Sequence, residues 1–224
     1  MHCANEKEWG QIFSYPGKIP QGQIFLVGTI HRLKTLEKPL ENFLKEVSPK
    51  VITAEISPFS ILYRRKRYHL WRTKIKKLRG KVPDEFLNLL ATALSMPYEF
   101  YLPKKLGLCP VVPVDLCTLA RKYLFQLEEL LANPPSVWEN TDSFAKELAF
   151  LRLFKEGLYF PPRDAEDMKR ERFMARKIKK LALLKRPLVH IGGWRHLPGL
   201  LSFLPEAVPV CLNPFSSSWG DNPN

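Results

Sequence analysis

The sequence predicts an α/β protein with a mostly parallel central sheet flanked by helices. Two short apolar runs, residues 24–27 and 188–191, are each closed by glycine, which is typical of strands buried on both faces. A strand, a helix and a second strand also follow one another within about thirty residues, the length of a parallel crossover unit. With 224 residues, 45% of them hydrophobic, the chain can bury this core as a single domain covering residues 1–224.

The first elements follow from turn signals and apolar spacing. Residues 12–13, ahead of a Pro-Gly turn, predict an edge strand, and residues 24–27 predict the strand after it. Four apolar residues at helical spacing then predict a helix that begins near Pro39 and ends before Pro49; they are Leu40, Phe43, Leu44 and Val47. Residues 51–54 form the next apolar run, which completes the crossover unit.

The middle of the chain is mainly helical. Residues 58–106 carry helical apolar spacing in two pieces that separate near residues 80–83, and this predicts a helical insertion or lid. Residues 111–114 predict a strand, and Pro110 and Pro113 favour an edge strand or an irregular one. Helices are expected over about 120–131, 142–156, 165–185 and 198–204, with strands at 188–191 and 208–212.

Composition limits the classes of protein to consider. The first ten residues are polar and no apolar run reaches the roughly 18–20 residues of a membrane span, so we expect a cytoplasmic protein without one. The four cysteines are scattered, which favours reduced thiols over a disulfide framework.

The formal charge of +13 is concentrated in residues 64–81, where ten lysines and arginines occur without an acid. Tyr68, Trp71, Ile75 and Leu78 recur there at helical spacing, which predicts an amphipathic helix with a solvated basic face. The alternative is a nucleic-acid-binding patch, because excess positive charge can mark such a partner.

Two histidines follow the two glycine-closed strands in the same way. His31 comes three residues after Gly28, and His196 comes three residues after Gly193. Because the carboxyl ends of strands line the ligand crevice of an open α/β sheet, the two imidazoles are expected to share one site. A histidine taken alone is more often one that caps its own turn by hydrogen bonding, and this is the alternative for each of the two.

A carboxylate and an arginine are expected at the same edge of the sheet. Glu55 directly follows the strand predicted at 51–54, as Asp115 follows the strand at 111–114. Arg170 lies one helical turn before the apolar stripe of the 165–185 helix, whereas Arg172 falls on a more solvated face. Arg170 is therefore the preferred functional arginine.

Four segments of this chain resemble the TraB/Tiki superfamily, which is marked by two Gly-x-x-His motifs, one glutamate and one arginine. They are residues 24–31, 51–56, 169–175 and 192–199, in the family's order. The resemblance places the histidines at His31 and His196, the glutamate at Glu55 and the arginine at Arg170. The superfamily includes metal-dependent proteases, an esterase that opens macrolide rings, a haem-binding protein and regulators of peptide pheromones.

Two imidazoles and a carboxylate suit a divalent ion such as manganese, cobalt or zinc, and three protein ligands leave a position for water. His31, Glu55 and His196 are thus the expected metal ligands, and Glu55 becomes a general base if only the histidines bind the ion. Arg170 would clamp a substrate carboxylate or a developing oxyanion. Trp194 is either a substrate-binding wall of the pocket or a packed loop aromatic.

The leading hypothesis is a metal-dependent hydrolase of amide or ester bonds, acting on a peptide or small molecule. The alternative from another class is a non-catalytic protein that uses the same cleft to bind a small ligand, a peptide or haem. A nucleic-acid-binding module working through residues 64–81 is the third hypothesis.

Overall fold

The structure is a computed structural model that describes residues 12–15, 17–135 and 144–213. In this part of the chain, six strands form one sheet in the order β1-β6-β2-β5-β3-β4, and every neighbouring pair is parallel. The strands are β1 (Phe13–Tyr15), β2 (Ile24–Thr29), β3 (Val51–Ala54), β4 (Val111–Pro113), β5 (Leu188–Gly193) and β6 (Val208–Leu212). The predicted α/β class is confirmed, and the strands predicted for the edges, β1 and β4, lie there.

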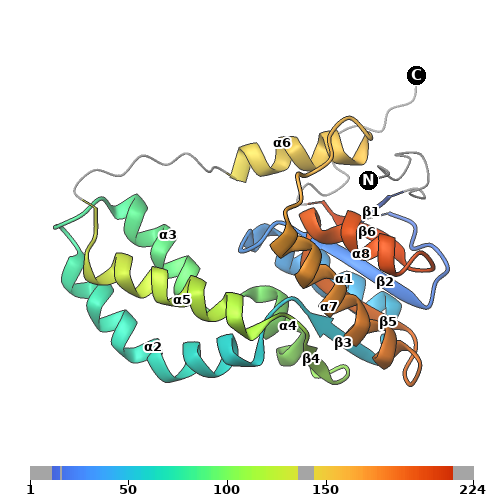
Figure 1. The fold of residues 1–224 in the computed structure, drawn as a ribbon, viewed down its shortest axis with the longest axis horizontal. Coiled ribbons are helices and arrows are strands. Elements are labelled where there is room, and N and C mark those ends of the chain that lie inside the picture. The colour runs from blue at the N-terminus through green and yellow to red at the C-terminus, as the bar shows by residue number, and fades with distance from the viewer. Residues whose placement is uncertain (1–11, 16, 136–143, 214–224) are drawn as a thin grey trace.

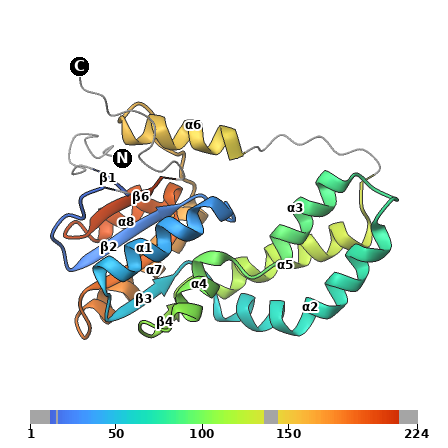
Figure 2. The same ribbon diagram turned by 180° about the vertical axis from the view of Figure 1, so that it is seen from behind.

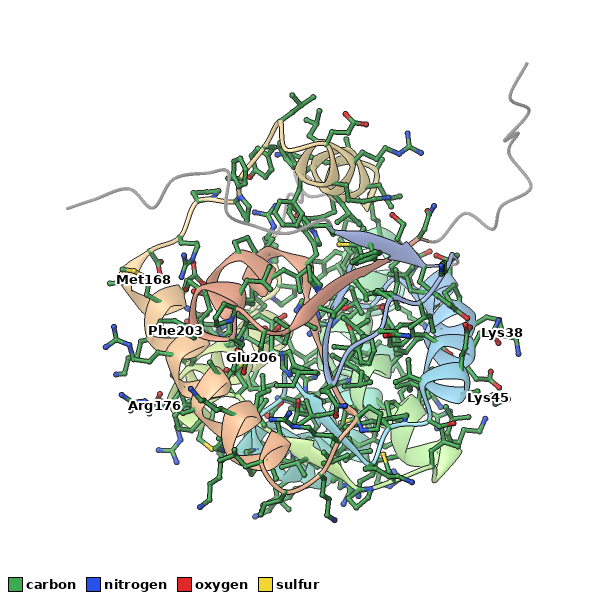
Figure 3. The ribbon with its side chains drawn as sticks, turned by 90° about the vertical axis from the view of Figure 1, so that its right-hand side faces the viewer. Lys38, Lys45, Met168, Arg176, Phe203 and Glu206 are labelled. Atoms are coloured by element: carbon green, nitrogen blue, oxygen red, sulfur yellow. The ribbon has the colours of Figure 1, made fainter. Side chains whose placement is uncertain are left out.

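Helices cover both faces of this sheet (Figures 1 and 2). Helix α1 lies on one face, and α7 and α8 lie on the other. Figure 3 shows Lys38 and Lys45 pointing outward from α1, and Met168 and Arg176 pointing outward from α7 on the opposite side. The helices are α1 (Glu37–Val47), α2 (Pro58–Leu78), α3 (Asp84–Leu94), α4 (Tyr98–Leu106), α5 (Cys117–Ala132), α6 (Phe144–Lys155), α7 (Ala165–Ala182) and α8 (Leu197–Phe203).

The covering of both faces explains the sequence of the central strands. Every residue of β2 and β5 is buried, so neither strand alternates between apolar and polar residues. Their side chains form the main core with α1, α4, α7 and α8. This layered packing holds the carboxyl ends of β2, β3 and β5 in fixed positions, and the candidate site is built there.

A second hydrophobic cluster holds together a helical lobe made of α2, α3 and α5. The lobe extends beyond the carboxyl edge of the sheet (Figure 1). Trp71 lies at its centre, with leucines from α3 and α5 around it. The segment at 58–106 therefore contributes α2 and α3 to the lobe, whereas α4 packs into the main core and α5, later in the chain, joins the lobe.

The basic segment at 64–81 lies on α2 and continues into the following turn. Trp71 is buried, and Ile75 and Leu78 pack against the lobe's core, as the spacing predicts. The prediction that Tyr68 belongs to the packed stripe is wrong, since 50% of this residue is exposed. Arg64 is buried instead, since its guanidinium bonds to carbonyls at the end of α3. No helix within the described residues is both long and apolar enough to cross a membrane.

Candidate active site

The two Gly-x-x-His segments meet because β2 and β5 are neighbouring strands. Gly28 is paired with Gly192, and Thr29 with Gly193, so both strands end at the same level. Strand β3 is the other neighbour of β5 and delivers Glu55 to this edge. His31, Glu55 and His196 thus come together from three strand ends, as the sequence predicts, and α7 adds Arg170.

Gly28 and Gly193 each leave space for residues of the other motif. A Cβ atom on Gly28 would lie 2.7 Å from Leu197 Cδ1 and 3.0 Å from Trp194 Cα, in the second motif. A Cβ atom on Gly193 would lie 2.7 Å from Nε2 of His31, in the first. Each strand end can approach the other only because it carries no side chain at that position.

The four predicted residues form one compact cluster centred on Glu55. Its Oε1 atom lies 3.7 Å from His31 Nε2 and 3.4 Å from His196 Nε2. Arg170 Nη2 donates to the same oxygen at 2.8 Å, and Arg170 Nη1 donates to His196 Nε2 at 3.1 Å. The backbone N–H of Gly193 donates to the other carboxylate oxygen at 2.7 Å.

Both imidazoles are oriented by buried carboxylates on their far side. His31 Nδ1 donates to Glu99 Oε1 at 2.9 Å, and His196 Nδ1 donates to Glu171 Oε1 at 3.1 Å. With its proton on Nδ1, each neutral ring leaves the lone pair of Nε2 facing Glu55. A carboxylate behind each histidine is the arrangement that fixes the tautomer of metal-binding histidines.

Helix α7 supplies the two groups that complete this arrangement. A capping box formed by Asp164 and Asp167 starts the helix and fixes where its first turn lies. Glu171 is fully buried on the face that packs against the core, where Arg163 donates to it through two nitrogens. Arg170, one residue earlier, turns toward the cleft, where Asp115 accepts from its Nε at 3.1 Å and its Nη2 at 2.9 Å.

The dense negative charge controls protonation of the histidines. Partial desolvation in the cleft disfavours the charged form of His31, but hydrogen bonds to Glu55 and Glu99 and their charges outweigh it and raise the pKa of His31 to about 10. The pKa of His196 is also raised, because the charge of Glu55 and the hydrogen bond to Glu171 overcome burial. The pKa of Glu55 is held well below its ordinary value against burial by His196, His31 and Arg170.

Two opposing influences act on the protonation of His196 Nε2. Its neighbours favour a proton on Nε2, whereas the hydrogen bond from Arg170 requires a bare lone pair there. While Arg170 donates, His196 is therefore the neutral tautomer with its proton on Nδ1.

The donor set fits a divalent cation in its chemistry and its charge. Donors 2.0–2.2 Å from one ion lie roughly 3–4 Å apart, and the Nε2 atoms lie 3.7 and 3.4 Å from Glu55 Oε1. Four carboxylates face two guanidinium groups, which leaves two negative charges when both imidazoles are neutral; the carboxylates are Glu55, Glu99, Asp115 and Glu171, and the guanidinium groups are Arg163 and Arg170.

Arg170 is the one group that opposes a metal ion in this arrangement. Among the described residues, no group of three or more His, Cys, Asp or Glu side chains is arranged so that it could hold a metal ion. The close pairs nevertheless exist, and the Arg170 guanidinium bonds to both Glu55 and His196. The guanidinium is itself a cation, and it occupies the donor atoms of Glu55 and His196 that an ion would need.

The cluster opens into a cleft of about 1120 Å³ between the sheet edge and the helical lobe. About 46% of the His31 side chain is accessible, so its ring faces this space. Trp194 is only 1% exposed and packs against Phe154, and its Nε1 donates to Glu147 at 3.1 Å. Trp194 borders the cleft, but the burial and contacts of its ring favour the packed-aromatic interpretation, and a substrate-binding role for it stays a prediction.

Two further carboxylates and one histidine complete the surroundings of the site. Glu171 was missed by the sequence analysis, although its position three and four residues before Met174 and Ala175 marks it as buried. Glu99 lies on α4, and one of its oxygens, Oε2, has no partner among the described residues. His190 lies in β5 and bonds to Thr53, and burial lowers its pKa to about 4, so it stays neutral.

Comparisons of the chain with protein-family models, with curated proteins and with solved structures gave no match. The resemblance to the TraB/Tiki superfamily therefore stays a prediction based on the four segments and their order.

Proposed function

We propose that this protein is a metal-dependent hydrolase of amide or ester bonds and a member of the TraB/Tiki superfamily. One observation carries the proposal. Two imidazoles, each bonded through Nδ1 to a buried carboxylate, turn their Nε2 atoms toward one oxygen of Glu55. This pattern supplies metal ligands together with the groups that orient them.

His31, Glu55 and His196 would hold the ion, for which manganese, cobalt and zinc are the candidates. Such an ion, when bound, supplies a water of lowered pKa and polarises a substrate carbonyl. Glu99 and Glu171 keep the two rings in the required tautomer, and the backbone N–H of Gly193 holds the Glu55 carboxylate in place.

Arg170 has two roles in this proposal. In the present arrangement its guanidinium compensates the charge of Glu55 and covers the lone pair of His196. Asp115 accepts hydrogen bonds from Nε and Nη2 of Arg170. Because these two bonds do not involve Nη1, the Arg170 side chain can stay at the site when Nη1 separates from His196. The freed N–H donors would then bind the substrate oxyanion as its negative charge develops.

The protonation of His31 argues against a mechanism in which the imidazole alone acts as the base. Without an ion, a pKa raised to about 10 keeps His31 protonated at neutral pH, so its ring has no lone pair to accept another proton. A bound ion would have to displace the proton on Nε2. Glu55, with its pKa held low, is the group that can remain ionised. It becomes the general base if the ion is held by the histidines alone.

The second candidate is a non-catalytic binding protein that uses the same cleft for a small ligand, a peptide or haem. It is favoured by the bonds of Arg170, which already satisfy Glu55 and His196 without an ion. The cleft of about 1120 Å³ is also large enough for a ligand of drug size.

A hydrolysis panel separates the two candidates. The protein, loaded in turn with manganese, cobalt and zinc, is assayed against fluorogenic peptides and esters, beside Glu55→Gln and Arg65→Gln variants. We expect metal-dependent turnover that Glu55→Gln abolishes and that Arg65→Gln, on the exposed outer surface of α2, leaves unchanged. Ligand binding in the cleft with no turnover under any metal would favour the binding protein.

A further inference from the structure

Two arginines enter the cleft without a carboxylate partner. Arg64, on α2, is 6% exposed and donates through Nη1 to the carbonyls of Ala93 at 2.7 Å and Ser95 at 2.8 Å. Arg32 donates through Nη2 to the same Ala93 carbonyl at 3.1 Å and through Nη1 to the Tyr123 hydroxyl at 3.0 Å. Within the described ranges, neither arginine takes part in an ion pair.

The two positive charges lie close together because they share one acceptor. Burial and the charge of Arg32 lower the pKa of Arg64 to about 10, which means that its environment disfavours the cation. Neutral carbonyl oxygens satisfy hydrogen bonds but do not cancel charge. A buried cation without a counter-charge is costly, and an anion in the cleft would relieve that cost.

Donor capacity remains on Arg64, which lines the cleft. Arg64 uses Nε for Ser60 at 3.0 Å and Nη1 for the two carbonyls, while its Nη2 has no hydrogen-bond partner among the described residues. Arg32, Arg64 and Tyr123 line the same cleft as His31 and Glu55. An anion bound to the free donors would therefore share the cavity of the proposed metal ligands.

The backbone at Arg32 supports a positioned role for this side chain. Arg32 follows His31 directly and has a φ of 66°, in the left-handed region that residues other than glycine seldom occupy. This conformation sends the two consecutive side chains to different partners: His31 bonds to Glu99, and Arg32 bonds to the helical lobe. Such strained positions persist where the surroundings fix them, often at binding sites.

We propose that Arg32, Arg64 and Tyr123 form an anion subsite that binds a carboxylate of the substrate. Two guanidinium groups and a hydroxyl suit the planar pair of oxygens of a carboxylate. The identity of the substrate rests on the proposed function: it would be an amide or ester that also carries an acidic group.

Binding of a small dicarboxylate tests the subsite without turnover. Glutarate is titrated calorimetrically into the full-length protein, with the uncharged glutaramide of the same shape as the ligand control. Wild type is expected to bind glutarate and not glutaramide. Arg32→Gln and Arg64→Gln should each weaken glutarate binding about tenfold or more, because each removes a charged donor. Tyr123→Phe, which keeps the ring, tests the hydroxyl if Arg64→Gln fails to fold.

Arg65→Gln is the matched control, since Arg65 neighbours Arg64 on α2 and is exposed. Equal glutarate affinity in wild type, Arg32→Gln and Tyr123→Phe would overturn the subsite, as would equal binding of glutaramide. The proposed hydrolase activity can be refuted separately from the subsite. If glutarate binding depends on Arg32 and persists in Glu55→Gln, but no peptide or ester is turned over, the subsite is retained and the hydrolase proposal is rejected.

Discussion

Substitution of Gly193 by alanine should damage the site while sparing the fold. The added Cβ would lie 2.7 Å from His31 Nε2, where ordinary contact begins at 3.4 Å, so the ring must move by about 0.7 Å. Gly193 has a φ of −63°, which alanine adopts without strain. Nearly half of the His31 side chain is accessible, so the ring can move into the cleft and the stability cost should stay below about 1 kcal/mol.

The expected loss lies in function. A 1 Å misplacement at a reacting centre can cost about 100-fold in rate, so a shift of about 0.7 Å should lower kcat/KM by roughly 10- to 100-fold. Metal affinity should fall as well, because Nε2 leaves its position relative to Glu55. The measurements are kcat/KM with a fluorogenic substrate, metal titration by calorimetry and the melting temperature of the metal-free protein.

Gly28→Ala is the matched control in the other motif. Its Cβ would lie 3.0 Å from the Trp194 Cα, and backbone cannot swing aside as an imidazole can. Overpacking of this kind costs about 1–3 kcal/mol, which lowers the melting temperature of a chain this long by about 2–4 °C per kcal/mol. If Gly193→Ala kept full metal affinity and activity, the proposed position of His31 Nε2 would be refuted.

Arg170, His31 and the basic surface of α2 give three further predictions. Arg170→Lys should reduce kcat/KM about 100-fold while changing metal affinity little, because a point charge replaces a fork of donors; an equal loss of both would place Arg170 in metal binding instead. In the metal-free protein, the raised pKa of His31 contributes stability that is complete below pH 6.5 and is lost as pH rises toward about 10. Melting temperatures measured from pH 6 to 10 should therefore decline more steeply in wild type than in His31→Gln. Parallel curves for the two proteins would contradict this. The exposed basic surface of α2 should bind duplex DNA only weakly. The nucleic-acid hypothesis would gain support from tight binding that the double substitution Arg65→Glu with Lys66→Glu abolishes. In that case the logarithm of the binding constant should fall against the logarithm of the salt concentration with a slope of about −0.9 per phosphate contact.

The fold was readable from the sequence where burial and topology leave distinct patterns. The residues of β2 and β5 are buried on both faces and therefore form apolar runs without alternation. Pro113 in β4 indicated an edge strand, since proline cannot donate a hydrogen bond to a neighbouring strand. The division of the helices between the lobe and the main core was less visible, because the apolar stripes of α4 and α5 do not say which surface each one covers.

The candidate site was predictable in part for a similar reason. His31, Glu55 and His196 follow strands directly, so the geometry of a parallel sheet brings them to one edge. Glu171 lies within a charged stretch of α7, and its hydrogen bond to His196 depends on how that helix packs, which the sequence does not show. Trp194 could not be assigned because a loop aromatic next to a site can face either the cleft or the core. Its neighbours Phe154 and Tyr159 are distant in the sequence and draw the ring into the core.

Metal binding by the purified protein tests the central claim most directly. After chelation, wild type, His31→Ala and His196→Ala are titrated calorimetrically with manganese, cobalt and zinc, with His69→Ala as the control because His69 is exposed on α2. We predict one ion per chain in wild type and His69→Ala, with binding lost in the other two variants. No binding of any of the three metals by wild type, or binding that survives both His31→Ala and His196→Ala, would contradict the proposed metal centre.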